Sequence, residues 1–103
     1  MQVTYADGVF EELVNLSFYL ADNDEDIAQN FLNACDKTFV FLVENRFVGS
    51  FKNFKNAGLA EVRMWRVKGF EKYLVFYKPI DNGVKILHVL HSSTDYNRVF
   101  ESD

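Results

Sequence analysis

The C-terminal half of the chain carries three short runs with the character of β-strands. Residues 62–67 alternate loosely between apolar and polar side chains, residues 73–77 are aromatic or β-branched, and residues 84–91 are mostly apolar. Such side chains favour strands because they fit a pleated, half-buried surface. Gly69 separates the first two runs. The pattern therefore predicts three consecutive strands.

A short segment separates the second and third runs and ends in the dipeptide Asn82-Gly83. Both residues tolerate the positive φ angles that a type I′ hairpin turn requires at its two central positions. Tight turns of this kind join antiparallel strands, so the three strands are expected to form a meander. A polar tail, residues 92–98, follows the last strand.

The N-terminal half shows helical periodicity after a strand-like segment, residues 1–5. Asp7 is placed to cap the first helix, because a carboxylate at the N-cap accepts unpaired amide hydrogens of the first turn. The positions assigned to the buried face recur at helical spacing. They are Phe10, Leu13, Val14, Ser17, Leu20 and Ala21.

A second helix is predicted after a break at Asp22-Asn23-Asp24, which offers another N-cap. Its apolar face is the clearest pattern in the chain and extends over about four and a half turns. The residues on this face are Ile27, Ala28, Phe31, Leu32, Cys35, Thr38, Phe39, Leu42 and Val43. Two helices joined by so short a break pack antiparallel, so a helical hairpin is expected to cover the sheet.

These elements predict an α+β fold: an N-terminal strand and an antiparallel helical hairpin packed on a C-terminal three-stranded antiparallel meander. At 103 residues, the chain is expected to form a single domain, residues 1–103. Residues 45–60 are expected to form a loop. Its aromatic residues Phe47, Phe51 and Phe54 either anchor the loop on the core or stack nucleobases, and anchoring is the favoured interpretation.

Composition and charge narrow the class of protein. Hydrophobic residues make up 49% of the chain, which excludes disorder. The net charge of −4 argues against sequence-specific nucleic-acid binding by the chain alone, because such binding usually needs a basic face. The charge is also polarised. Residues 7–36 contain acidic residues and no Lys or Arg, whereas most of the basic residues lie between 46 and 72.

No hydrophobic run is long enough to span a bilayer, and the N-terminus lacks the basic and apolar regions of a signal peptide. The single cysteine, Cys35, cannot form an internal disulfide, and its place in the apolar helix face predicts a packing role. We therefore expect a cytoplasmic protein without membrane association. No metal and no cofactor is expected, since the few His and Cys residues have no ligand-like spacing.

The order of elements and several short motifs resemble the ParE/RelE superfamily of toxins from type II toxin–antitoxin systems. The matching motifs are Val62-Arg63, Val67, Gly69-Phe70, Tyr73-Leu74-Val75-Phe76-Tyr77 and Ile86 to His91. The resemblance extends from residue 1 to about residue 100 and implies a toxin that a cognate antitoxin neutralises. In such a complex a partner strand adds to an open sheet edge and a helix fills an apolar groove. In this acidic chain, the antitoxin's contacts should concentrate on the basic residues 46–72.

The superfamily contains two mechanisms. RelE-like members cleave messenger RNA on the ribosome, and this chemistry uses an Arg after the strand tyrosine, a second Arg in the tail and a Tyr near the C-terminus. The corresponding positions here are Leu74, Thr94 and Phe100, and none of them can perform that chemistry. ParE-like members bind DNA gyrase, trap it on cleaved DNA and need no catalytic residues. The resemblance therefore favours the ParE-like branch with gyrase as the target.

Two alternatives to the gyrase poison stay open. One is an RNase of the RelE class that uses substitute residues such as Arg63, Lys68, Lys72 and His91. The other is a non-toxic relative that acts as a regulatory partner.

Candidate residues for binding the target or the antitoxin lie on the predicted strands and in the tail. They are Arg63, Arg66, Lys68, Lys72, Tyr73, His91 and Asp95. Arg63 and Arg66 lie three apart on one strand, so they should point to opposite faces. The structural alternative for Arg63 is an ion pair with an acidic helix residue.

The two histidines have different predicted roles. His88 is expected to be a partly buried, hydrogen-bonded histidine on the face of Ile86 and Leu90. His91 is, with Arg63, a weak candidate for catalysis, because an imidazole can serve as an acid or a base and Asp95 could orient it. The favoured interpretation of the polar cluster around His91 is a capping and turn role.

Overall fold

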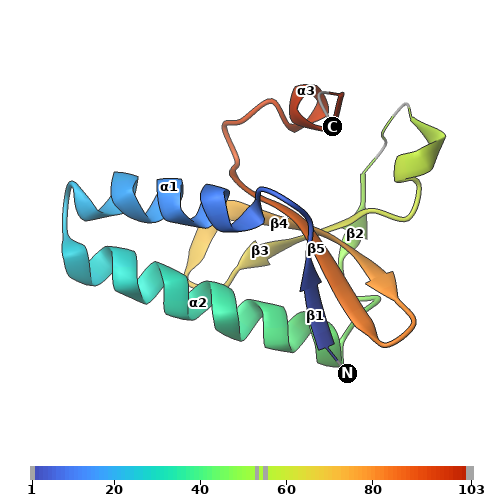
Figure 1. Cartoon of the computed structure of the whole chain (residues 1–103), viewed down its shortest axis with the longest axis horizontal. Coiled ribbons are helices and arrows are strands. Elements are labelled where there is room, and N and C mark those ends of the chain that lie inside the picture. Colours follow the sequence, from blue (N-terminus) through green and yellow to red (C-terminus); the bar gives the residue numbers. More distant parts are fainter. Residues whose placement is uncertain (1, 53, 55, 102–103) are drawn as a thin grey trace.

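The computed structural model describes residues 2–52, 54 and 56–101. Within these ranges, a strand and two helices precede four strands and a short C-terminal helix (Figure 1). The elements are β1 (Gln2–Tyr5), α1 (Val9–Ala21), α2 (Glu25–Glu44), β2 (Ser50–Phe51), the 3₁₀ turn η1 (Ala57–Leu59), β3 (Arg63–Val67), β4 (Phe70–Ile80), β5 (Gly83–His91) and α3 (Tyr96–Glu101). The strands form a mixed sheet in the order β1-β5-β4-β3-β2. The predicted α+β fold, with its helical hairpin and antiparallel meander, is confirmed.

Strand β4 lies in the middle of the sheet and is buried on both faces. Tyr73, Val75 and Tyr77 belong to a large apolar cluster that includes the buried residues of α1 and α2. Leu74 and Phe76 belong to a second cluster. Because successive side chains of a strand point to opposite faces, this run of buried residues requires cover on both sides of the sheet.

The C-terminal segment supplies the cover on the second face, where the sequence pattern predicted only a polar tail. Tyr96 and Phe100 of α3 lie against Phe76, with ring centroids 5.1 and 5.4 Å away. Phe54 joins them, 4.8 Å from Phe100. Figure 1 shows α3 lying apart from the helical hairpin. The prediction missed this layer because two aromatic residues four positions apart are hidden in a segment that is polar on average.

Strand β1 runs parallel to β5 at the edge of the sheet. Gly83 begins β5, and a Cβ built there would lie 1.7 Å from the carbonyl oxygen of Gln2. The turn before it consists of Asp81 and Asn82, and no described non-glycine residue has a positive φ. The predicted type I′ turn centred on Asn82-Gly83 is therefore wrong, and the glycine instead allows β1 to approach β5.

The buried face of α1 matches the prediction only in part, because Leu13 is buried and Leu20 packs against the core as expected. Val9 and Leu13 are its buried residues, whereas Phe10 and Val14 are 63% and 48% exposed. Apolar side chains lie on more than one face of this helix, so the sequence periodicity fits two rotations. Packing against the sheet selects the rotation that points Val9 inward.

The start of α1 also differs from the prediction. Gly8, and not Asp7, is the N-cap residue, and no side chain caps the helix. Gly8 has a φ of 91°, a left-handed conformation that a residue with a Cβ adopts only at a cost of about 1–2 kcal/mol. The glycine therefore makes the sharp turn from β1 into α1.

Helix α2 follows its predicted pattern closely. The side chain of Asp24, its N-cap, accepts a hydrogen bond from the Asp26 amide at 2.8 Å. The buried residues are Ala28, Phe31, Cys35, Thr38, Phe39 and Leu42. Ile27, placed on the same face by the sequence pattern, is instead exposed because it lies in the first turn, at the end of the hairpin. None of the described helices has the length and apolar character needed to cross a membrane.

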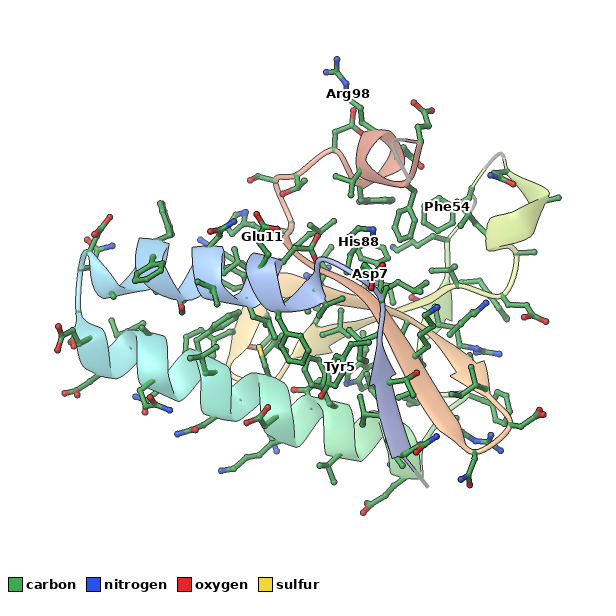
Figure 2. The ribbon with its side chains drawn as sticks, viewed as in Figure 1. Tyr5, Asp7, Glu11, Phe54, His88 and Arg98 are labelled. Atoms are coloured by element: carbon green, nitrogen blue, oxygen red, sulfur yellow. The ribbon has the colours of Figure 1, made fainter. Side chains whose placement is uncertain are left out.

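Glu12 of α1 forms hydrogen bonds with the part of β5 that is not paired with β1. Strand β1 pairs with β5 only as far as Ile86. Beyond that point, the Glu12 carboxylate accepts a hydrogen bond from the Val89 amide at 3.0 Å and lies 2.7 Å from Nδ1 of His88. Figure 2 shows His88 close to the start of α1. One carboxylate thus takes the place of a strand partner.

The prediction for His88 is confirmed in part. Its side chain is 12% exposed and hydrogen-bonded. A register shift between β4 and β5 at Phe76/Tyr77 puts His88 opposite Phe76, however, and Ile86 opposite Tyr77. His88 therefore lies on the α3 side of the sheet, against Phe100, and not on the face of Ile86.

Replacing Glu12 should destabilise the protein measurably. Glu12→Ala leaves the Val89 amide without its acceptor, which costs about 1–3 kcal/mol for a buried donor. The neighbouring Glu11→Ala removes an exposed carboxylate and should change stability by less than about 0.5 kcal/mol. Urea unfolding of both variants measures the difference, and equal stabilities would contradict the role assigned to Glu12.

Candidate partner-binding surface

A groove of about 1060 Å³ runs between helix α2 and strand β3. Its lining combines apolar side chains with a polar and charged rim. The residues are Asn30, Asn33, Ala34, Lys37, Thr38 and Phe41 of α2, Ser50 of β2, Met64, Trp65 and Arg66 of β3, and Lys68 and Glu71 of the following turn and strand. A volume of this size accommodates several side chains of a partner.

Two aromatic residues form the apolar part of the groove. The Phe41 and Trp65 rings are stacked, with centroids 5.7 Å apart and planes inclined by 22°. Phe41 is 40% exposed, although it extends from the helix that supplies most of the core. A partly exposed aromatic pair in a concave surface offers the kind of contact that dominates binding at protein interfaces.

The sheet edge beside this groove is open. Strand β2 pairs only with Arg63 and Met64 of β3. Among the described residues, no strand pairs with the outer side of Trp65–Val67. Unpaired backbone groups at a sheet edge can accept an added strand from a partner. The open edge and the groove therefore form one surface, which we call the β3 groove.

Basic residues predominate at the rim of the β3 groove. Lys37, Arg66 and Lys68 line it together with one acidic residue, Glu71. Nη1 of Arg66 donates a hydrogen bond to the Glu71 carbonyl oxygen at 2.7 Å. The Glu71 carboxylate accepts one from the Gly69 amide. The rim thus favours a partner segment with acidic side chains.

The structure divides the predicted site residues between two ends of the sheet. Arg66, Lys68 and Lys72 lie around the β3–β4 turn. Tyr73 and His91 lie near them on paired strands, with ring centroids 5.1 Å apart. Burial raises the pKa of the Tyr73 phenol, and the nearby Tyr19 adds to the effect.

Arg63 lies at the other end of β3. It pairs with Tyr77 and faces the side of the helices, whereas Arg66 pairs with Leu74 and faces the opposite side, so the predicted opposite orientation is confirmed. The proposed ion pair with an acidic helix residue is wrong. Arg63 instead donates hydrogen bonds to the carbonyl oxygens of Phe47 and Gly49, both at 2.9 Å.

The polar cluster after β5 has the turn and capping role that was the favoured interpretation. Nδ1 of His91 lies 2.7 Å from the Ser93 hydroxyl and accepts a hydrogen bond from the Ser93 amide at 3.1 Å. The Asp95 carboxylate accepts a bond from the Arg98 amide at 3.4 Å, at the start of α3. Asp95 therefore does not orient His91.

The positions that correspond to the RelE nuclease residues are occupied by groups with structural roles. Leu74 and Phe100 are 5% and 7% exposed in the second apolar cluster. The Thr94 amide donates to the His91 carbonyl oxygen in the turn. No group of three or more His, Cys, Asp or Glu residues that could hold a metal ion occurs in the described part of the chain.

Sequence reasoning missed Lys37, Phe41 and Trp65 as site residues. Lys37 lies outside the apolar face of α2 and is exposed, and a single exposed charge on a helix carries little information. Phe41 offered a signal, because it is a large apolar residue outside that apolar face. Only the arrangement of α2 across β3 brings these side chains to one groove.

The chain is a small α+β protein with a helical hairpin on one face of its sheet and an open sheet edge beside an aromatic groove. A family model described as the ParE toxin of the type II toxin–antitoxin system parDE matches residues 3–96. The chain therefore belongs to the ParE toxin family. A search of curated proteins found no match.

The Cys35 thiol should be inert in the folded protein. Burial, with a smaller contribution from Asp36, raises its pKa to about 12. At pH 8 only roughly one thiol in ten thousand would then be ionised, whereas the unfolded chain regains an ordinary cysteine pKa near 8.5. We expect a disulfide reagent to label Cys35 in guanidinium and not in native buffer.

The same pKa shift predicts a pH dependence of stability. Because the pKa of Cys35 is raised in the folded protein, the stability that comes from burying the neutral thiol is complete below about pH 8.5. This stability is lost as the pH rises towards 12. Fast labelling of Cys35 by the disulfide reagent in the native protein at pH 8 would contradict both expectations, because it would show that the thiol is accessible and its pKa is ordinary.

Proposed function

We propose that this chain is a growth-inhibiting toxin that binds DNA gyrase in the cytoplasm. The observation that carries the proposal is the match to the ParE toxin family over residues 3–96. The burial of Leu74 and Phe100 supports it, because a RelE-type nuclease needs reactive side chains at those positions. A gyrase poison of this kind acts by binding and requires no catalytic residue of its own.

We also propose that the cognate antitoxin, a ParD-type protein, neutralises the toxin by occupying the β3 groove. An extended antitoxin segment would add a strand to the open edge of Trp65–Val67. Apolar side chains would pack on Phe41 and Trp65, and acidic side chains would meet Lys37 and Lys68 on the rim. Predicted site residues Arg66 and Lys68 then contact the antitoxin, and Arg63 does not.

Inhibition of gyrase is the direct test of the target. We expect the purified toxin to inhibit supercoiling by gyrase and to increase the amount of cleaved DNA in the reaction. Expression in a bacterial host should arrest growth with a DNA-damage response while protein synthesis continues at first. Addition of equimolar antitoxin to the gyrase assay is the control and should restore supercoiling.

Other outcomes would point to other functions. Immediate loss of translation, with cleaved messenger RNA and normal gyrase activity, would contradict the gyrase proposal and favour a RelE-type nuclease. Normal growth and normal gyrase activity would favour a non-toxic relative.

Two substitutions on α2 test the antitoxin site. Phe41→Asp places a negative charge in the β3 groove and removes the aromatic contact with Trp65. We expect it to weaken antitoxin binding by at least about tenfold, the effect of losing 1.4 kcal/mol at an interface centre. Isothermal titration with the purified antitoxin gives the dissociation constants.

Val40→Asp is the matched control for Phe41→Asp. Val40 is the preceding residue of the same helix, is 56% exposed and lies outside the groove lining. The same substitution there should change the affinity less than about threefold, since surface changes away from a contact usually cost little. Equal losses in the two variants would contradict the placement of the antitoxin in the β3 groove.

A further inference from the structure

Arg63 lies between two exposed phenylalanines at the end of β3 remote from the β3–β4 turn. Its guanidinium carbon is 4.0 Å from the ring centroid of Phe51 and 5.5 Å from that of Phe47. Phe47 and Phe51 are 64% and 56% exposed. The favoured interpretation of these two residues as loop anchors is therefore wrong, whereas Phe54 does pack against the core.

The loop that carries these rings is held firmly. The Tyr77 hydroxyl donates a hydrogen bond to the Arg46 carbonyl oxygen at 3.0 Å and accepts one from the Gly49 amide at 2.8 Å. A Cβ at Gly49 would lie 2.5 Å from the Tyr77 hydroxyl, so only glycine permits this approach. The backbone on both sides of Phe47 is thus held in place, which lowers the entropy cost of ordering this segment on binding.

A second arginine completes the cluster. The guanidinium carbon of Arg46 lies 5.2 Å from the ring centroid of Phe47. Its Nη1 donates to the Ile80 carbonyl oxygen at 2.5 Å. Among the described residues, no carboxylate lies within ion-pairing distance of Arg46 or Arg63. Within the part of the chain that the structure describes, both guanidinium groups donate through Nη1 to backbone carbonyls, so Nε and Nη2 can donate to another ligand.

The cluster borders a hollow of about 540 Å³. Phe47, Phe51, Arg46 and Arg63 line it, together with Glu61, Pro79, Ile80 and Asp81. Glu61 and Asp81 carry negative charges in the hollow, and Arg46 and Arg63 carry an equal number of positive charges. The local charge is therefore balanced, whereas the chain as a whole is acidic. Largely exposed aromatic rings beside guanidinium groups suit a ligand with flat rings joined by anionic groups.

We propose that the cluster of Arg46, Phe47, Phe51 and Arg63 binds single-stranded DNA by stacking unpaired bases. Bases stack on aromatic rings and on guanidinium planes, and phosphates accept hydrogen bonds from arginine. This contact does not depend on sequence, since every base has a π-face. The choice of DNA over RNA rests on the proposed function, because the proposed target, gyrase, acts on DNA.

Fluorescence anisotropy of the full chain with a labelled oligothymidine tests the proposal without gyrase. An oligonucleotide of about 20 residues exceeds the roughly 4–16 nucleotides that small single-strand binders cover. We expect binding at low salt that is tighter than to the matched duplex. Phe47→Ala and Phe51→Ala should each weaken it at least about fivefold, the loss of roughly 1 kcal/mol of stacking.

Phe18→Ala is the matched control, because Phe18 is 68% exposed on α1 and lies outside the hollow. It should leave DNA binding unchanged. All three residues are exposed, so thermal melting should show the variants folded. Equal affinities of the three variants, or a preference for oligouridine over oligothymidine, would overturn the proposal. The proposal would also be overturned if the Phe47→Ala and Phe51→Ala variants bound DNA normally but no longer bound gyrase or the antitoxin. The cluster would then be a contact site for a protein.

The supercoiling assay keeps the two proposals distinguishable. If the toxin binds single-stranded DNA through these rings and gyrase stays active, the gyrase proposal alone fails. If gyrase is inhibited equally by the wild type and the Phe47→Ala and Phe51→Ala variants, and no oligothymidine binds, the stacking proposal alone fails.

Discussion

The burial of strand β4 on both of its faces is the constraint on which the rest of the structure depends. Tyr73, Val75 and Tyr77 need one apolar layer, and Leu74 and Phe76 need another on the opposite side. The helical hairpin can supply only one of these layers. The short helix α3, with Phe54 from the loop, supplies the other. A single strand thus dictates that both the middle and the end of the chain fold back on the sheet.

The two edges of the sheet differ in how they are paired, and this difference leaves the proposed partner-binding surface at β3. Strand β1 pairs with the first half of β5, and the Glu12 carboxylate accepts the hydrogen bond of the Val89 amide beyond it. At the β3 edge, the two-residue strand β2 covers only Arg63 and Met64. Strand β1 is itself an edge strand, but the unpaired segment of β3 lies beside the groove, which favours strand addition there. That place adjoins the aromatic groove below α2, so backbone pairing and side-chain recognition can occur together.

The basic residues in the middle of the chain lie on two separate surfaces. Arg66 and Lys68 belong to the β3 groove, whereas Arg63 and Arg46 belong to the aromatic cluster at the other end of β3. A strand rises about 3.3 Å per residue, so side chains only three positions apart are separated by about 10 Å as well as by the face on which they lie. In the proposed function, such separation allows an antitoxin and a target to be bound by different residues.

The sequence by itself determined the elements whose apolar residues recur at one clear spacing, namely the strands of the meander and helix α2 with its Asp24 cap. The short break between the helices also determined that they pair. The sequence also determined the family, through short motifs in a fixed order. Only the tertiary structure decided the rotation of α1, the parallel pairing of β1 with β5, the second layer built by Tyr96 and Phe100, and the meeting of Phe41 with Trp65. The physical reason is that periodicity reports which side chains of one segment share a face. Which faces meet depends on burial summed over segments that are distant in the chain.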